Sequence, residues 1–322
     1  MERNSKIFIA GRYGLVGSAI ERCLRAKGYE NIIGKRHGEL DLTSQFNTER
    51  FIGSEQPEYV FLCSAKVGGI LSNFTYPAEF IFSNLQIQNN IIDSSLAYKV
   101  KKMLFMGSSC IYPRNCKQPI KEEYLLSGPL EETNRAYAVA KIAGIEMCRS
   151  YNRQYGTQYI PVMPTNLFGP NDTYDSFNSH VIPGLMMKFA KAKKENEKSV
   201  TLWGSGSPLR EFLHSDDLAE ACILIMEKYS FGGTGQDQDH IINIGSGEEV
   251  SIFGLAGMIK KIMGYHGEIL WDTSKPDGTP RKLLDSSFIR SLGWTPKFSM
   301  EEGLKTVIEA MEKQWSLDKF IN

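Results

Sequence analysis

Short apolar runs alternate with longer amphipathic stretches through the first half of the chain. The apolar runs end at glycine, proline or polar clusters, which is typical of buried strands. We expect strands at residues 6–10, 32–33 and 103–106. A further strand that runs into a loop is expected over 58–66, and a strand followed by a proline-glycine loop over 161–170. The stretches between them repeat apolar residues at helical spacing, which predicts helices at residues 18–28, 77–98 and 137–154. This alternation favours an α/β fold with a parallel sheet.

The pattern becomes irregular after residue 170. Residues 191–198 are a charged segment that we expect to be mobile, and a glycine-rich surface loop is expected through residues 232–240. No linker or repeat divides the chain cleanly, so we expect a nucleotide-binding domain over residues 1–170 and mainly a smaller α/β substrate-binding lobe over residues 171–322. The segments expected to return to the first domain lie near 213–229 and 241–245.

Composition narrows the function classes. The chain has 322 residues, with 37 Lys and Arg against 37 Asp and Glu, so its formal charge gives no support to a nucleic-acid or anionic-membrane partner. No apolar run is long enough to span a membrane, and the N-terminus leads directly into a strand without a signal-peptide core. The six cysteines show no Cys-x-x-Cys spacing, which argues against a zinc site and a disulfide framework. We expect a cytoplasmic enzyme or binding protein.

A glycine turn follows the first strand. Gly11, Gly14 and Gly17 have the spacing G-x-x-G-x-x-G and lead into the helix at 18–28. Glycines between a strand and a helix permit a tight turn and let the backbone approach a pyrophosphate at the helix N-terminus. The turn therefore predicts a dinucleotide site, and a plain strand-to-helix turn remains the alternative.

The second strand ends in Lys35, Arg36 and His37. NAD usually has an acidic residue near this point, whereas a basic tip suits the 2′-phosphate of NADP. Arg12, in the glycine turn, could join the basic tip, and Asp41 could lie near the adenine. A solvated basic turn is the alternative interpretation.

Tyr137 and Lys141 lie four residues apart, so they share one face of the predicted helix. We expect the lysine ammonium to lower the pKa of the phenol from its ordinary value of about 10. Ser108 follows the strand at 103–106, where it could hold a carbonyl oxygen within reach of the phenol. A serine, a tyrosine and a lysine arranged in this way can protonate a carbonyl oxygen while a hydride is transferred to the carbonyl carbon. Taken alone, the Tyr-Lys pair could also be an ordinary surface pair on a helix.

The helix at residues 77–98 is long and apolar on two sides. Its apolar residues include Phe80, Leu85, Ile87, Ile91 and Ile92. A helix that is apolar on two sides is covered on its outer side as well, so we expect a dimer partner there.

Together these motifs resemble the extended short-chain dehydrogenase/reductase family. The resemblance runs from about residue 5 to residue 310 and includes stretches at 65–70, 107–113, 137–144, 150–156, 162–170, 179–183, 203–214 and 275–285. Within that family the match is to enzymes that epimerise GDP-4-keto-6-deoxy-D-mannose at C3 and C5 and reduce it at C4. The resemblance implies a Rossmann-type, doubly wound parallel sheet that binds NADP(H), a smaller C-terminal substrate lobe, and a homodimer.

The resemblance also assigns roles to matching positions. Tyr137 would donate a proton at the C4 carbonyl, Ser108 would polarise that carbonyl, and Lys141 would bind the nicotinamide ribose and tune Tyr137. Cys110 and His180 would be the acid/base pair of the epimerisation. Cofactor binding would fall to Gly11, Arg12, Tyr13, Gly14, Leu15, Val16, Gly17, Arg36, Asp41, Leu42, Lys141, Pro164, Thr165, Asn166, Leu167 and His180. The GDP-sugar would be bound by Lys188, Trp203, Arg210 and Asp277.

Some alternatives stay open. Cys110 could be a small buried hydrophobic residue, and His180 a satisfied loop histidine. Lys188 stands where the family commonly has an arginine, which keeps the charge but loses the bidentate fork. The substrate could be a related GDP-4-keto-hexose or a GDP-heptose, and outside enzymes the chain could be an NADP-sensing regulator.

Overall fold

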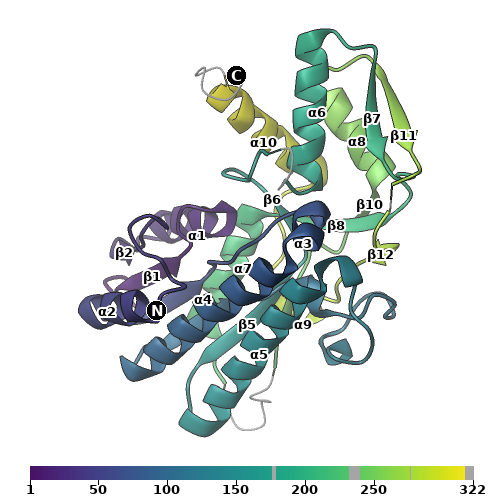
Figure 1. The fold of residues 1–322 in the computed structure, drawn as a ribbon. Coiled ribbons are helices and arrows are strands. Elements are labelled where there is room, and N and C mark those ends of the chain that lie inside the picture. The colour runs from purple at the N-terminus through teal and green to yellow at the C-terminus, as the bar shows by residue number, and fades with distance from the viewer. Residues whose placement is uncertain (176–178, 232–239, 276, 316–322) are drawn as a thin grey trace.

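The computed structural model describes residues 1–175, 179–231, 240–275 and 277–315, which form a sheet-based domain and a smaller lobe (Figure 1). The domain is built on one six-stranded sheet in which every pair of neighbouring strands is parallel. The sheet confirms the predicted α/β class. From edge to edge its strands are β2 (Ile32–Ile33), β1 (Ile7–Ala10), β3 (Tyr59–Leu62), β4 (Lys102–Met106), β5 (Tyr159–Pro164) and β9 (Ile242–Ile244).

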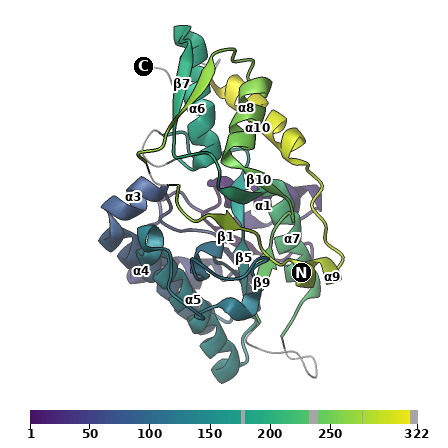
Figure 2. The same cartoon turned by 90° about the vertical axis from the view of Figure 1, so that its right-hand side faces the viewer.

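Helices cover both faces of this sheet (Figure 2). Successive strand residues point to opposite faces, so Ile7 and Ile9 pack on one side while Phe8 and Ala10 pack on the other. The first side is covered by α1 (Leu15–Ala26), α7 (Ser215–Lys228) and α9 (Ser287–Ser291). The second side is covered by α2 (Gln45–Glu55), α4 (Pro77–Ala97) and α5 (Arg135–Tyr155).

The order of the strands creates a crevice beside β1. The chain passes from β1 to β2 on one side and then returns to place β3 on the other side of β1. The loops that follow β1 and β3 therefore diverge, and ligands of open α/β sheets bind at such points. The two segments are still close directly after the strands, where a Cβ added to Gly11 would lie only 2.9 Å from the backbone nitrogen of Ser64.

The smaller lobe has its own strands and core. Strand β8 (Leu209–His214) pairs with β6 (Asn166–Phe168), β10 (Glu249–Ser251) and β12 (Arg281–Lys282), and β7 (Ser199–Trp203) pairs with β11 (Glu268–Asp272). The helices of this lobe are α6 (Val181–Glu195), α8 (Ile252–Ile262) and α10 (Met300–Trp315). Their buried residues form a core separate from the two cores of the large sheet. Three later elements lie with the first domain instead, since α7 and α9 cover its sheet and β9 is its edge strand.

Three local predictions need correction or comment. The charged segment at 191–198 is largely helical, because α6 continues to Glu195 and buries Phe189 and Ala192 while its lysines face outward. The loop after β3 leads into a further helix, α3 (Ile70–Thr75). The expected glycine-rich loop at 232–240 lies almost wholly outside the described residues.

The apolar pattern of α4 is largely satisfied within the chain. Leu85 is half-buried, and four of its apolar residues are buried: Phe80, Ile87, Ile91 and Ile92. These four therefore do not require a partner chain. Within the described part of the protein, no helix combines the length and apolar character needed to cross a membrane.

Candidate active site

The glycine turn is shaped to hold an anion. Gly11 has a φ of +83°, and a Cβ on Gly17 would collide with the carbonyl oxygen of Gly11, so both positions require glycine. Helix α1 begins directly after Gly14, which provides no side-chain cap, and its first turn contains no acidic residue. Backbone N–H groups at an uncapped helix N-terminus bind phosphate. The turn therefore fits the pyrophosphate of a dinucleotide, with Leu15 and Val16 in the first turn of α1.

The arginines beside this turn differ in their surroundings. Arg12 makes a bidentate ion pair with Glu21, in which Nε and Nη2 each lie 2.6 Å from a carboxylate oxygen. This pairing lowers the pKa of Glu21 to about 2. Arg36 is exposed, and its guanidinium lies 4.3 Å from the ring centre of Tyr13. The positive charge that is accessible to a phosphate is thus that of Arg36, while the charge of Arg12 is already balanced.

Asp41 and Leu42 lie in the segment that follows the basic tip. Asp41 Oδ1 accepts hydrogen bonds from the N–H and the hydroxyl of Thr43, at 2.9 and 2.7 Å, and these bonds lower its pKa. The carbonyl of Leu42 accepts a hydrogen bond from the side chain of Asn90 in α4 at 2.9 Å. The turn is therefore fixed to α4.

Ser108, Tyr137 and Lys141 are brought together, as their positions in the sequence predict. Ser108 follows the end of β4, and its hydroxyl is hydrogen-bonded to the phenol of Tyr137. Lys141 is buried, with Nζ 5.8 Å from the ring centre of Tyr137, and it donates to the carbonyl of Met106 at 2.8 Å. A phenol, a hydroxyl and an ammonium thus lie at the carboxyl end of β4, which is where carbonyl chemistry requires them.

The expected effect of Lys141 on the phenol is wrong. The pKa of Tyr137 is raised, first by burial and then by the neighbouring Cys110, and its hydrogen bond with Ser108 offsets this only in part. Burial lowers the pKa of Lys141 itself to about 8. Desolvation outweighs the lysine charge because the ammonium points to the carbonyl of Met106. The phenol consequently stays protonated at neutral pH, the form that donates a proton.

Cys110 and His180 both lie near a lysine that sequence reasoning did not single out. Lys282, in β12, donates from Nζ to the sulfur of Cys110 at 3.6 Å. Partial desolvation lowers the pKa of His180, and the charge of Lys282 lowers it further. Cys110 is half-buried and the side chain of His180 is still exposed to solvent, so neither fits a buried core residue. The one signal for Lys282 in the sequence is its place within the stretch 275–285 that resembles the family.

The four residues expected to bind the GDP-sugar lie in one region of the smaller lobe. Lys188 Nζ lies 5.8 Å from the ring centre of Trp203, whose side chain is 56% exposed. Asp277 accepts from the N–H and the hydroxyl of Ser205 at 2.7 and 2.8 Å. Arg210 Nη2 donates to the carbonyl of Asp277 at 3.5 Å. Lys275 Nζ lies 5.7 Å from the same ring. An exposed aromatic face beside two lysines suits a base and a diphosphate.

Arg210 connects this region to the thiol. Burial lowers the pKa of Arg210, and the charges of Asp277 and Cys110 act in the opposite direction. The guanidinium is therefore within electrostatic reach of Cys110, so the GDP-sugar residues and the candidate acid/base pair border a common site.

Glu211 fixes the segment Pro164–Leu167, which runs from the end of β5 into β6. Its carbonyl accepts from the side chains of Thr165 and Asn166 at 3.2 and 2.9 Å. Its fully buried carboxylate accepts from the N–H groups of Gly247 and Leu284 at 2.7 and 3.0 Å. Leu284 lies two residues after Lys282. Sequence reasoning missed Glu211, which ties the predicted nicotinamide strand to the segment that contains this lysine.

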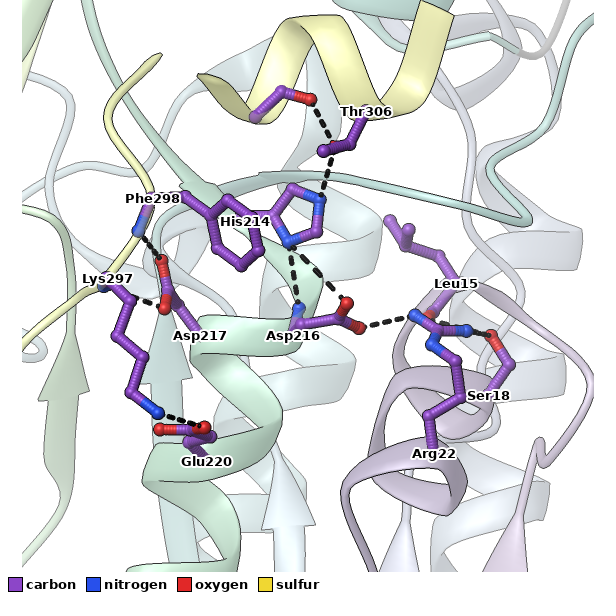
Figure 3. A network of polar contacts seen from close by, with 11 residues as sticks. Leu15, Ser18, Arg22, His214, Asp216, Asp217, Glu220, Lys297, Phe298 and Thr306 are labelled. Atoms are coloured by element: carbon purple, nitrogen blue, oxygen red, sulfur yellow. Dashed lines mark hydrogen bonds and ion pairs between the residues drawn. The ribbon is translucent and has the colours of Figure 1, made fainter. Parts of the chain in front are cut away.

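A polar network links α1, the helix that follows the glycine turn, to α7 (Figure 3). Arg22 of α1 pairs with Asp216 of α7 and donates to the hydroxyl of Ser18 at 3.3 Å. His214 Nδ1 accepts from the N–H of Asp216 at 3.3 Å, and burial lowers its pKa. Its Nε2 faces the hydroxyl of Thr306 in α10 at 3.4 Å. The network holds α1 against α7 and joins both to the smaller lobe.

Known proteins share this arrangement. Residues 7–245 match the NAD dependent epimerase/dehydratase family. A putative GDP-L-fucose synthase 2 from Arabidopsis thaliana is 54% identical over 321 residues, which is 100% of this chain and 94% of that protein. The GDP-L-fucose synthase of Escherichia coli (strain K12) is 48% identical over 316 residues, covering 97% of each chain.

A solved structure agrees with these relatives. The GDP-mannoheptose C4 reductase from Campylobacter jejuni with NADP bound has a TM-score of 0.88 and 41% identity, covering 97% of this chain and 99% of that one. The two relatives and the solved structure align with both the sheet domain and the smaller lobe of this chain. The chain therefore belongs to the NAD dependent epimerase/dehydratase family, the extended short-chain dehydrogenases/reductases that its motifs resemble.

Proposed function

We propose that this chain converts GDP-4-keto-6-deoxy-D-mannose to GDP-L-fucose with NADPH, by epimerisation at C3 and C5 followed by reduction at C4. The observation that carries the proposal is the placement of Cys110, which lies two residues after Ser108 and accepts a hydrogen bond from Lys282. A reductase that does not epimerise does not need a thiol paired with an ammonium at this point. The 48–54% identity to proteins named GDP-L-fucose synthases supports the same substrate.

Cys110 and His180 are proposed to perform the epimerisation. The C4 ketone acidifies the C–H bonds at C3 and C5, because each carbanion is an enolate. Cys110 takes up the proton as the base, with the ammonium of Lys282 against its sulfur, and releases it to solvent before the next inversion. The electron pair moves into the enolate, whose negative charge develops on the C4 oxygen. His180 returns a proton on the opposite face of the ring and regains one from solvent, to which its side chain is exposed.

Ser108, Tyr137 and Lys141 are proposed to serve the reduction. When bound, NADPH supplies the hydride for C4. Ser108 holds the C4 oxygen by a hydrogen bond, and Tyr137 gives it a proton from a phenol that burial keeps neutral. Lys141, whose ammonium donates a hydrogen bond to the carbonyl of Met106, lies next to Tyr137, where it would contact the nicotinamide ribose.

Cofactor and nucleotide are proposed to bind at two ends of the site. Residues 1–170 would bind NADP(H) through the glycine turn, with Arg36 and Tyr13 at the 2′-phosphate and Pro164–Leu167 beside the nicotinamide. Residues 171–322 would mainly bind the GDP-sugar, with the base against Trp203. Lys188 and Arg210 supply positive charge for the diphosphate, which supports this assignment.

We also propose that the chain forms a homodimer and acts in the cytoplasm. Phe82 of α4 is 60% exposed, and large exposed aromatic side chains are enriched at interfaces between proteins. The support for α4 as an interface comes from this residue, since the other apolar residues of the helix are largely covered by the chain itself.

The assay is NADPH oxidation with purified substrate, combined with identification of the product sugar by NMR. With GDP-4-keto-6-deoxy-D-mannose we expect oxidation of NADPH and a product inverted at C3 and C5. No oxidation with this substrate, together with rapid turnover of a GDP-4-keto-heptose, would overturn the proposal.

A GDP-heptose derivative is the second candidate substrate. The favouring observation is the 41% identity and TM-score of 0.88 to a GDP-mannoheptose C4 reductase. Parallel assays with the two substrates distinguish the candidates by their kcat/KM values. A higher kcat/KM for the 6-deoxyhexose supports the first proposal.

A further inference from the structure

Asn134 precedes α5 in the N-cap position, yet its side chain does not cap the helix. An asparagine in this position usually accepts a hydrogen bond from an amide of the first helical turn. Here Oδ1 is buried and has no hydrogen-bond partner within the described part of the chain. A buried acceptor without a partner is unfavourable, and native proteins rarely retain one without a reason. The side chain is thus arranged to receive a donor that the chain itself does not supply.

That donor would enter from a small cavity beside the thiol. The cavity has a volume of about 30 Å³, and Asn134, Cys110 and Lys282 are among the residues that line it. A space of this size holds one or two water molecules, or a single hydroxyl group of a ligand. The unpartnered amide oxygen and the candidate epimerase base therefore border the same space.

Other polar residues that line the cavity are already hydrogen-bonded or ion-paired. Arg114 Nε lies 3.2 Å from Glu131 Oε2, and Thr279 donates to the same oxygen at 3.4 Å. The other oxygen, Glu131 Oε1, accepts from the N–H of Thr133 at 3.3 Å. Among the described residues that line the cavity, Asn134 provides the one buried side-chain acceptor that lacks a partner.

We propose that Asn134 accepts a hydrogen bond from the C3 hydroxyl of the sugar and orients the C3–H bond toward Cys110. This inference rests on the proposed function, in which Cys110 acts at C3 and at C5. Of these two carbons only C3 bears a hydroxyl, since C5 bears the methyl group and the ring oxygen. An acceptor beside Cys110 therefore matches the C3 hydroxyl. Asn134 also lies one helical turn before Tyr137, so it is on the side of α5 that faces the site.

The test follows deuterium exchange from D₂O into GDP-4-keto-6-deoxy-D-mannose, resolved at C3 and C5 by NMR. Asn134→Ala is expected to slow exchange at C3 by about tenfold or more and to change exchange at C5 less than about threefold, because only C3 carries the recognised hydroxyl. Asn134→Asp keeps the acceptor oxygen, so it should restore most of the exchange at C3. Equal losses at both carbons, or no loss at C3, would overturn the inference.

A second measurement does not depend on exchange. With a GDP-4-keto-3,6-dideoxy sugar, which lacks the C3 hydroxyl, wild type and Asn134→Ala should show the same KM, whereas with the normal substrate the variant should show a higher KM. Because the side chain makes no cap, Asn134→Ala is expected to fold and to keep its melting temperature. A wild-type chain that neither exchanges deuterium nor oxidises NADPH refutes the proposed function. Normal wild-type exchange with an unchanged C3 to C5 ratio in the variant refutes only the role of Asn134.

Discussion

Lys282 donates a hydrogen bond to the sulfur of Cys110 at 3.6 Å, although 172 positions separate the two residues in the sequence. Lys282 belongs to β12 of the smaller lobe, whereas Cys110 follows β4 of the sheet domain. The contact therefore joins the two lobes at the point where the epimerisation is proposed to occur. The ammonium of Lys282 thus lies against the sulfur that is proposed to act as the base.

Lys282→Met tests this contact, because it keeps the length of the side chain and removes the charge. We expect deuterium exchange at both C3 and C5 to slow by about 10- to 100-fold, since the sulfur loses the cation that contacts it. Alkylation of Cys110 by iodoacetamide should slow in parallel. Lys117→Met, at an exposed lysine in the nearby loop, is the control and should leave both rates unchanged. An unaltered exchange rate in Lys282→Met would show that the lysine does not act on the thiol.

Cys110→Ser and Tyr137→Phe separate the two proposed reactions. Cys110→Ser should block deuterium exchange, because a serine hydroxyl keeps its proton at neutral pH and offers no anionic base. Tyr137→Phe should retain exchange and lose NADPH oxidation by about 100-fold or more, since only the reduction needs the phenolic proton. Both are followed by NMR and NADPH absorbance. If the two variants lose both activities together, the division of roles is wrong.

Substitutions of Arg36 and Arg12 form a matched pair that tests the preference for NADPH over NADH. Arg36→Ala should raise the KM for NADPH by about tenfold and leave the KM for NADH unchanged, because its exposed guanidinium is the one accessible to a 2′-phosphate. Arg12→Ala should change the KM for NADPH less than about threefold. It should instead lower the free energy of unfolding by about 1–2 kcal/mol, because it leaves the half-buried Glu21 without its bidentate partner. A larger effect of Arg12→Ala on the KM would reverse this assignment.

Local signals predicted the sheet domain well. The apolar run before Gly11 and the glycine spacing after it are short-range features, and they predicted β1 to within one residue. The helix after the turn was also predicted, although α1 begins at Leu15, three residues earlier than expected. Ser108 and Tyr137 could be placed because one follows a strand and the other begins a helix. The same approach failed at residues 191–195, where a charged surface concealed a helix whose Phe189 and Ala192 are buried.

Long-range relationships could not be predicted from the sequence. The spacing of Tyr137 and Lys141 predicted their proximity, but not the burial that reverses the expected pKa shift of the phenol. The ion pair between Arg12 and Glu21 depends on how α1 leaves the glycine turn. Glu211 reaches Leu284 across 73 residues, and no local pattern marks such a contact.

Lys141→Met tests the burial of the lysine through the pH dependence of stability. Unfolded lysine holds its proton up to about pH 10.5, whereas folded Lys141 releases it above about pH 8. Between these values the unfolded chain binds more protons, so the unfolding free energy of wild type should rise with pH relative to the variant. The shift corresponds to a gain on the order of 3 kcal/mol over this range. Urea unfolding of both proteins from pH 8 to pH 10.5 measures it, with Lys117→Met as the control that should show no such slope. A stability difference that stays constant with pH would show that Lys141 keeps its ordinary pKa.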